Sequence, residues 1–201
     1  MSRVLVIRGE NKTGKSTIAL TAPRNIGWHE FDIGGLERAA WRFEGWRDYV
    51  KLYQYKLPLN DLEGLKDKIG LAGRRKQVSR VIGMSEIWDQ FADNFIADIQ
   101  AKDTHTIVVD PSAKMWKVNT QSLLQEKQQE QIDKAVNQGK NEAQVDIRER
   151  LIQIEYGPCN ERMVSLIDIA KSAGKNLIFT TYMDDGREEK LIGGKIQNVT
   201  T

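Results

Sequence analysis

Residues 9–17 read Gly9-Glu10-Asn11-Lys12-Thr13-Gly14-Lys15-Ser16-Thr17 and directly follow the apolar run Val4-Leu5-Val6-Ile7 and Arg8. This is the pattern G-x-x-x-x-G-K-[ST], placed between an expected buried strand and a short expected helix over residues 15–21. The glycines let the backbone bend closely around a phosphate, and successive inward-pointing N–H groups form an anion-binding nest. The stretch therefore predicts a phosphate-binding loop at the end of the first strand.

The loop residues have distinct expected roles in binding ATP with Mg²⁺. The backbone of residues 9–17 would surround the phosphates, Lys15 would reach the β- and γ-phosphates, and the Ser16 hydroxyl would hold Mg²⁺. The alternative is a Gly-rich turn that matches by chance. A match at the first strand–helix junction of a chain favours the nucleotide site, because that is the structural context the motif requires.

A second apolar run ends in an acid. Thr106-Ile107-Val108-Val109-Asp110 follows a helix predicted over residues 84–101, whose apolar residues recur at helical spacing. A carboxylate at the end of such a strand, downstream of a phosphate-binding loop, is typical of a magnesium site in nucleoside triphosphatases. Asp110 is therefore predicted to hold Mg²⁺, directly or through water.

Three acids near the end of a predicted second strand, residues 28–32, are candidates to position the attacking water. In open α/β sheets, ligands bind outside the carboxyl ends of the strands, which is where Glu30 and Asp32 would lie. Glu37 is a further candidate. Asp32 has an alternative role, because it could simply cap a helix expected over residues 35–43.

The composition suits a single domain without disulfides. The chain has 201 residues, 40% of them hydrophobic, a net charge of +2 and one cysteine, Cys159, which excludes an intrachain disulfide and fits a reducing cytoplasm. No run of eighteen apolar residues and no signal-peptide pattern is present, so we expect a cytoplasmic protein without a membrane segment. Because the total charge is small, DNA binding would have to depend on local clusters. The densest is Arg74-Arg75-Lys76, which could contact a phosphate backbone or could be part of a solvated loop.

The remaining segments, among them a third strand expected over residues 46–55, are expected to complete one α/β unit. Residues 113–150 contain a long polar stretch and could form a helical arm, a spacer or a subunit contact. Gly157-Pro158 is expected to break the chain before a helix that begins near Asn160. Asn176–Tyr182 reads as a buried strand whose polar end would lie beside the phosphate-binding loop, and a hairpin or loop would follow.

Taken together, the chain resembles the RecA-like P-loop ATPases encoded by bacteriophages, some of which act in single-strand annealing or recombination. The resemblance rests on five pieces: residues 9–17, Phe31-Asp32-Ile33-Gly34-Gly35, Thr106–Asp110 with Pro111-Ser112-Ala113, Gln153-Ile154-Glu155-Tyr156-Gly157, and Asn176–Tyr182. It implies a RecA-like fold over residues 1–201, with a mainly parallel sheet and helices on both faces. One position differs: Gly34 stands where these enzymes usually carry the glutamate that activates water. Glu30, Asp32 or Glu37 would then take that role.

The expected function is Mg²⁺-dependent ATP hydrolysis coupled to DNA handling in phage recombination, annealing or replication. Single-stranded DNA, contacted through Arg74, Arg75 and Lys76, and further copies of the chain are the expected partners. Two alternatives stay open. One is a DNA-binding module that ATP switches with negligible turnover, and the other is a small-molecule kinase whose lid would be residues 57–81.

Overall fold

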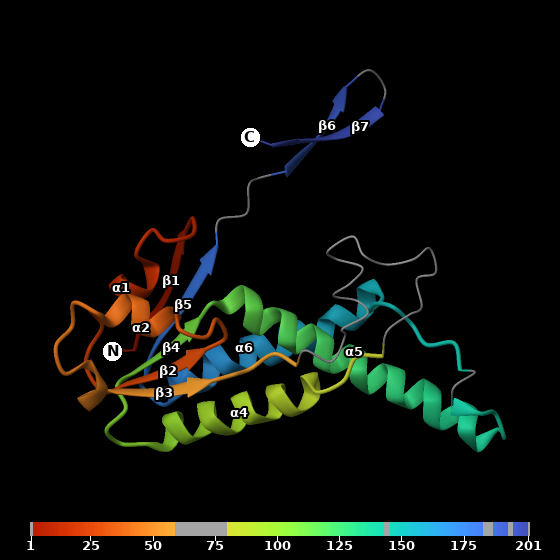
Figure 1. Ribbon diagram of the computed structural model, residues 1–201, viewed down its shortest axis with the longest axis horizontal. Helices are drawn as coiled ribbons and strands as arrows, with labels where there is room; N and C mark the ends of the chain where they lie inside the picture. The colour runs from red at the N-terminus through yellow and green to blue at the C-terminus, as the bar shows by residue number, and fades with distance from the viewer. Residues whose placement is uncertain (1, 59–79, 143–144, 183–186, 193–194, 201) are drawn as a thin grey trace.

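A five-stranded parallel sheet forms the centre of the molecule (Figure 1). The structure, a computed structural model, describes residues 2–58, 80–142, 145–182, 187–192 and 195–200. The strand order in the sheet is β1-β5-β4-β2-β3, and every pairing in it is parallel. The strands are β1 (Val4–Gly9), β2 (Ile26–Glu30), β3 (Val50–Gln54), β4 (Thr106–Asp110) and β5 (Asn176–Tyr182). The predicted α/β class with a parallel sheet is confirmed.

Helices cover both faces of this sheet, as predicted. One face carries α1 (Lys15–Ala19) and α2 (Gly35–Ala40); the other carries α4 (Met84–Gln100), α5 (Ser112–Asn137) and α6 (Tyr156–Ser172). Side chains alternate along each strand, so Val108 packs in the core under α1 and α2, whereas Ile107 and Val109 pack in the core under α4, α5 and α6. This alternation decides which strand-end residues face the phosphate-binding loop.

The carboxyl ends of the strands meet at one edge of the sheet. β4 lies between β5 and β2 and is buried along its whole length, which suits its β-branched sequence. Glu30 is paired in register with Asp110, and Gly9 with Tyr182. The end of the first strand and the acid-terminated fourth strand are therefore brought to the same edge, although β5 lies between them.

Glutamines explain how the polar middle of α5 folds as a regular helix. The Gln125 side-chain oxygen accepts hydrogen bonds from Met84 N (2.8 Å) and Ser85 N (3.2 Å), amides at the start of α4 that have no partner within that helix. Gln128 is buried; its Oε1 accepts from Val81 N at 2.7 Å and its Nε2 donates to Arg148 O at 2.8 Å. The polar stretch thus serves as a set of hydrogen-bonding partners for neighbouring chain segments.

Three local expectations were wrong. The first strand was expected to be buried, but β1 lies at the edge of the sheet, and its Val4, Leu5 and Val6 side chains are exposed. Pro158 does not delay α6, which begins at Tyr156, because a proline in the first turn of a helix lacks only an N–H that has no intrahelical partner. The third strand does not start at Trp46, since residues 46–48 form a short 3-10 helix, η1 (Trp46–Asp48), before β3. A second 3-10 helix, η3 (Gln153–Glu155), precedes α6.

The expected hairpin at the end of the chain is present. β6 (Arg187–Ile192) and β7 (Lys195–Thr200) pair antiparallel as a separate two-stranded sheet, away from the central sheet in Figure 1. Among the described residues, no helix is both long and apolar enough to cross a membrane.

Candidate active site

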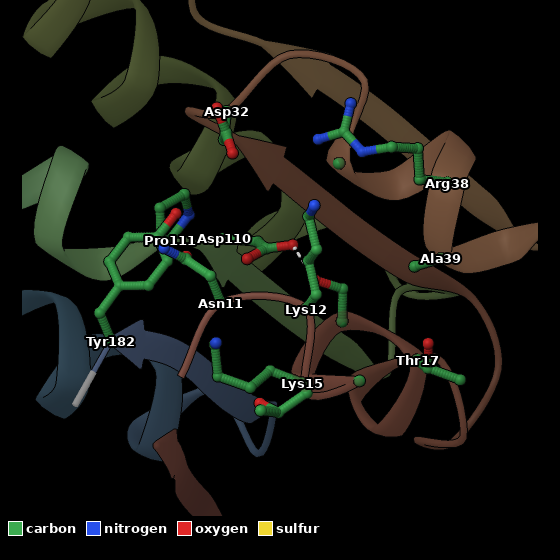
Figure 2. A pocket seen from close by; sticks show the side chains of 14 residues that line it. Asn11, Lys12, Lys15, Thr17, Asp32, Arg38, Ala39, Asp110, Pro111 and Tyr182 are labelled. Carbon is green, nitrogen blue, oxygen red and sulfur yellow. Dashed lines mark hydrogen bonds between the residues drawn. The ribbon is translucent and has the colours of Figure 1, made fainter. Parts of the chain in front are cut away.

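A cavity of about 540 Å³ opens where the phosphate-binding loop meets the carboxyl ends of the strands (Figure 2). Its volume lies in the usual range for a small-molecule site. Three cationic and two acidic side chains line it, so its lining is positive on balance and suits an anion. The lining residues are Asn11, Lys12, Thr13, Gly14, Lys15, Ser16, Thr17, Asp32, Gly35, Arg38, Ala39, Asp110, Pro111 and Tyr182.

The predicted loop residues divide into two groups. Residues 11–17 all line the cavity, whereas the carbonyl oxygens of Gly9 and Glu10 accept hydrogen bonds from Lys15 Nζ. Gly14 has φ of 85°, a left-handed conformation that favours glycine. Gly9 is constrained by space, because a Cβ there would lie 2.7 Å from the Thr13 hydroxyl oxygen. These constraints explain the two glycines of the motif.

The Lys15 ammonium is held at the cavity by backbone oxygens. Its Nζ donates hydrogen bonds to Gly9 O (2.9 Å) and Glu10 O (2.5 Å), and it lies 5.1 Å from the centre of the Tyr182 ring. A phosphate oxygen is a stronger acceptor for an ammonium group than a neutral carbonyl, because both partners carry charge. Lys15 is therefore placed to exchange these carbonyls for a phosphate.

Asp110 accepts hydrogen bonds from two hydroxyl groups that come from different elements. Ser16 Oγ in α1 donates to Asp110 Oδ2 at 2.7 Å, and Thr180 Oγ1 in β5 donates to Asp110 Oδ1. The sequence pattern predicted the first pairing. Side-chain alternation explains the second, because Thr180 in β5 lies on the same face of the sheet as Val108 and Asp110 in β4. The two predicted metal ligands, Ser16 and Asp110, are in direct contact.

The donor set at this point fits Mg²⁺. A serine hydroxyl and an aspartate carboxylate are hard oxygen ligands, the type that Mg²⁺ prefers, and this ion usually takes only one or two protein ligands beside waters and substrate phosphates. Both groups line the same cavity as Lys15. Ser16 and Asp110 could hold the ion without any rearrangement of the strands.

The three candidate acids for positioning water have different environments. Glu30 is buried, and its carboxylate accepts hydrogen bonds from Leu36 N (2.7 Å), Gly34 N (3.2 Å) and Gln54 Nε2 (2.7 Å). Its oxygens are thus used to stabilise the start of α2. Glu37 forms a surface ion pair with Arg47 at 3.6 Å.

Asp32 is the acid of the three that lines the cavity. Its Oδ1 accepts a hydrogen bond from Lys114 Nζ at 2.6 Å, and its side chain is 44% exposed. In Figure 2, Asp32 and Arg38 lie on one side of the cavity and Lys15 on the other. The expected alternative, capping of α2 by the Asp32 side chain, is not observed; its backbone oxygen accepts from Gly35 N instead, at 2.9 Å.

Two cationic residues at or beside the cavity were not predicted as site residues. Arg38, in α2, lines the cavity. Lys114, in α5, does not line the cavity itself but bonds to Asp32, which does. The signal that could have found both is their position after a strand: Arg38 lies in α2, the helix that follows β2, and Lys114 lies one turn after Asp110 at the end of β4.

Tyr182 at the end of β5 also lines the cavity, in agreement with the expectation that this strand ends beside the loop. Burial raises the pKa of its phenol, and the nearby Asp32 carboxylate raises it further. The phenol therefore stays protonated at neutral pH and can donate a hydrogen bond. The predicted DNA contacts, Arg74, Arg75 and Lys76, lie outside the described residues.

A parallel sheet whose first strand enters a G-x-x-x-x-G-K-S loop, with a serine–aspartate pair at the strand ends, defines a P-loop ATPase. A family model described as AAA domain matches residues 1–200, and the chain belongs to this family of nucleotide-binding ATPases. A search of curated proteins found no match to the chain.

Proposed function

We propose that the protein hydrolyses ATP with Mg²⁺, using the cavity between the phosphate-binding loop and β4. The observation that carries this proposal is the 2.7 Å contact between Ser16 and Asp110 in a cavity that Lys15 also lines. These three side chains come from the loop and from a strand nearly a hundred residues later. Their meeting supplies a metal-binding pair and a phosphate-binding cation at one point.

The proposed reaction is direct transfer of the γ-phosphoryl group to water. A bond forms between the water oxygen and the γ-phosphorus while the bond from that phosphorus to the β–γ bridging oxygen breaks, and ADP keeps the electron pair. The amides of residues 11–17 and the Lys15 ammonium would stabilise the charge on the phosphate oxygens. Asp32 would accept a hydrogen bond from the water, whose proton leaves to solvent with the released phosphate.

Mg²⁺ held by Ser16 and Asp110 would neutralise part of the charge on the β- and γ-phosphate oxygens. Asp32, rather than Glu30, is proposed as the water-positioning acid because its carboxylate lines the cavity. The Glu30 oxygens already accept three hydrogen bonds from protein groups. Phosphoryl transfer requires positioning of the water more than a strong base, which suits an aspartate that is also bonded to a lysine.

Phosphate release by the full chain tests this proposal. Lys15→Ala removes the cation of the loop, and we expect it to abolish phosphate release and to weaken binding of a fluorescent ATP analogue. Lys171→Ala, an exposed lysine on α6, is the matched control and should behave as the unaltered protein. Equal phosphate release by the unaltered protein and Lys15→Ala would contradict the ATPase proposal.

We further propose that hydrolysis is coupled to DNA handling of the phage recombination, annealing or replication type. The support is the resemblance to phage RecA-like ATPases together with the basic run Arg74-Arg75-Lys76. A labelled single strand should bind with an affinity that falls as salt rises, because phosphate contacts release counterions. Replacing the three basic residues by glutamine should weaken binding and reduce the salt dependence, and salt-independent binding would contradict the proposal.

The same assay separates the alternative functions. ATP binding and single-strand binding without phosphate release would indicate a switched binding module. Formation of ADP without free phosphate, only when an acceptor is added, would indicate a small-molecule kinase. We propose that the active form is a homo-oligomer, which light scattering with and without ATP analogue would test.

A further inference from the structure

Lys114 stands out among the cations near the cavity because its partner is an acid rather than the phosphate-binding loop. It lies in the first turn of α5, which begins directly after Asp110 and Pro111. Its Nζ donates to Asp32 Oδ1 at 2.6 Å. Residues 32 and 114 are far apart in the chain, so only the tertiary fold makes this pair.

We propose that Lys114 is a positioning residue for hydrolysis, which fixes the Asp32 carboxylate so that its second oxygen faces the attacking water. This inference rests on the ATPase activity proposed above. Within the described part of the chain, Asp32 Oδ1 bonds to Lys114 and no other side chain bonds to the Asp32 carboxylate. Without Lys114 the half-exposed carboxylate would be free to rotate, and its two oxygens would no longer have distinct positions.

Hydrogen bonds fix the segments that carry Asp32 and Lys114 to the ends of the strands. Phe31 N donates to Asp110 O at 2.8 Å, which ties the chain segment before Asp32 to the end of β4. Ser112 Oγ donates to Thr180 O at 2.9 Å, and this bond ties the start of α5 to β5. Asp32 and Lys114 therefore project from two segments that are both fixed to the strands around Asp110. Because the backbone on both sides of the pair is fixed, the Asp32 carboxylate can be kept within the narrow range of positions that catalysis needs.

The pair is not expected to matter for stability. Both side chains are more than a third exposed, and ion pairs of this kind contribute little to the free energy of unfolding because solvent screens them. A role in positioning and a merely structural role therefore predict different results. The first changes the turnover number, and the second would change the melting temperature.

The decisive experiment is a double-mutant cycle on steady-state phosphate release. Lys114→Met keeps the length of the side chain without its charge, and we expect kcat to fall by about tenfold or more, with KM for ATP within about twofold of the unaltered value. Lys114→Arg keeps the donor and should recover most of the loss. Asp32→Asn should lower kcat at least as far, and adding Lys114→Met to it should cause no further loss, because Lys114 acts through Asp32.

The control and the contrary outcomes are defined by the same cycle. Lys117→Met, an exposed lysine one turn further along α5, should leave kcat, KM and the melting temperature unchanged. If the two substitutions multiply their effects, Lys114 acts on the nucleotide directly and the inference is wrong; a raised KM with unchanged kcat has the same meaning. If the unaltered protein releases no phosphate, the proposed ATPase function itself fails, and this inference fails with it.

Discussion

Ser16 and Asp110 are 94 positions apart in the chain, and the hydroxyl of the first donates a 2.7 Å hydrogen bond to the carboxylate of the second. One residue lies where the predicted phosphate-binding loop enters α1, and the other lies at the end of the central strand β4. The contact exists because β5, which lies between β1 and β4 in the sheet, carries the small Thr180 on that face, and Thr180 bonds to the other oxygen of Asp110. The geometry of the proposed metal site therefore depends on the order of the strands in the sheet.

Asp110→Asn tests that site. Asparagine has the same shape and can still accept a hydrogen bond from Ser16, so we expect the melting temperature to change little. It lacks the negative charge that holds a divalent cation, so phosphate release should fall about a hundredfold or more. Chelation of divalent ions with EDTA should produce the same loss in the unaltered protein. Asp89→Asn, an exposed aspartate on α4, is the control; full activity of Asp110→Asn at all Mg²⁺ concentrations would contradict the prediction.

Glu30→Gln separates a structural acid from a catalytic one. The glutamine amide nitrogen cannot accept the hydrogen bonds that Glu30 takes from Leu36 N, Gly34 N and Gln54. At least one buried donor would lose its partner, at a cost of about 1–3 kcal/mol in the free energy of unfolding. We expect urea denaturation to show this loss, while kcat changes less than in Asp32→Asn. A drop in kcat larger than that of Asp32→Asn, without loss of stability, would assign the water-positioning role to Glu30 instead.

Gly27→Ala should destabilise the sheet–helix contact between β2 and α4. A Cβ at residue 27 would lie 1.8 Å from Asp98 Oδ2, and Asp98 is fully buried and cannot move aside without breaking its bonds to His29 and Tyr53. We expect a loss of about 1–3 kcal/mol or more in the free energy of unfolding. Gly157→Ala is the matched control, because no atom outside its own helix and chain neighbours lies within 4 Å of a Cβ there. Equal stability of the two variants would show that β2 and α4 are not packed this closely.

The buried His29 predicts acid-sensitive stability. Its Nδ1 is 2.7 Å from the Tyr55 hydroxyl and its Nε2 is 3.1 Å from Asp98, an arrangement that fits a neutral imidazole donating to Asp98. Burial lowers the pKa of His29 below the ordinary value of 6.5 for histidine, and it outweighs the hydrogen bond and charge of Asp98, which act in the opposite direction. The folded state therefore binds a proton less readily than the unfolded state. The stabilisation is complete above the unfolded pKa and is lost as pH falls below about 6.5.

We expect the free energy of unfolding to decrease by up to about 1.4 kcal/mol per pH unit from this group alone, below pH 6.5 and down to the lowered pKa. His29→Gln should be less stable at pH 7.5, and its stability should depend less on pH between about 6.5 and 5. His105→Gln, at an exposed position, should keep the pH dependence of the unaltered protein. Parallel pH profiles for all three proteins would show that His29 does not cause the effect.

The sequence located the strands and the loop well where the local signal is strong. Thr106–Asp110 and Asn176–Tyr182 have the predicted bounds, because a short apolar run of strand length between polar residues favours a strand of a covered parallel sheet. The pattern at residues 9–17, together with the acid that ends residues 106–110, was sufficient to predict that Ser16 and Asp110 lie together. The sequence was insufficient at Pro158, whose effect depends on its position in the helix. It was also insufficient in the Gln125–Gln131 stretch, whose partners are in distant segments.

Local chemistry alone determined the phosphate-binding loop, the acid at the end of β4 and the class of fold, because glycine conformation, strand periodicity and the lysine–serine pair are properties of neighbouring residues. Only the tertiary structure decided which of the candidate acids lies at the cavity. Glu30, Asp32 and Glu37 are equivalent in the sequence, but the alternation of β2 turns Glu30 into the amides of α2, and Glu37 lies on the surface. The turn that follows β2 leaves Asp32 at the cavity beside Lys114. The position of Asp32 at the cavity depends on contacts between segments that are distant in the chain. A short stretch of sequence therefore cannot predict it.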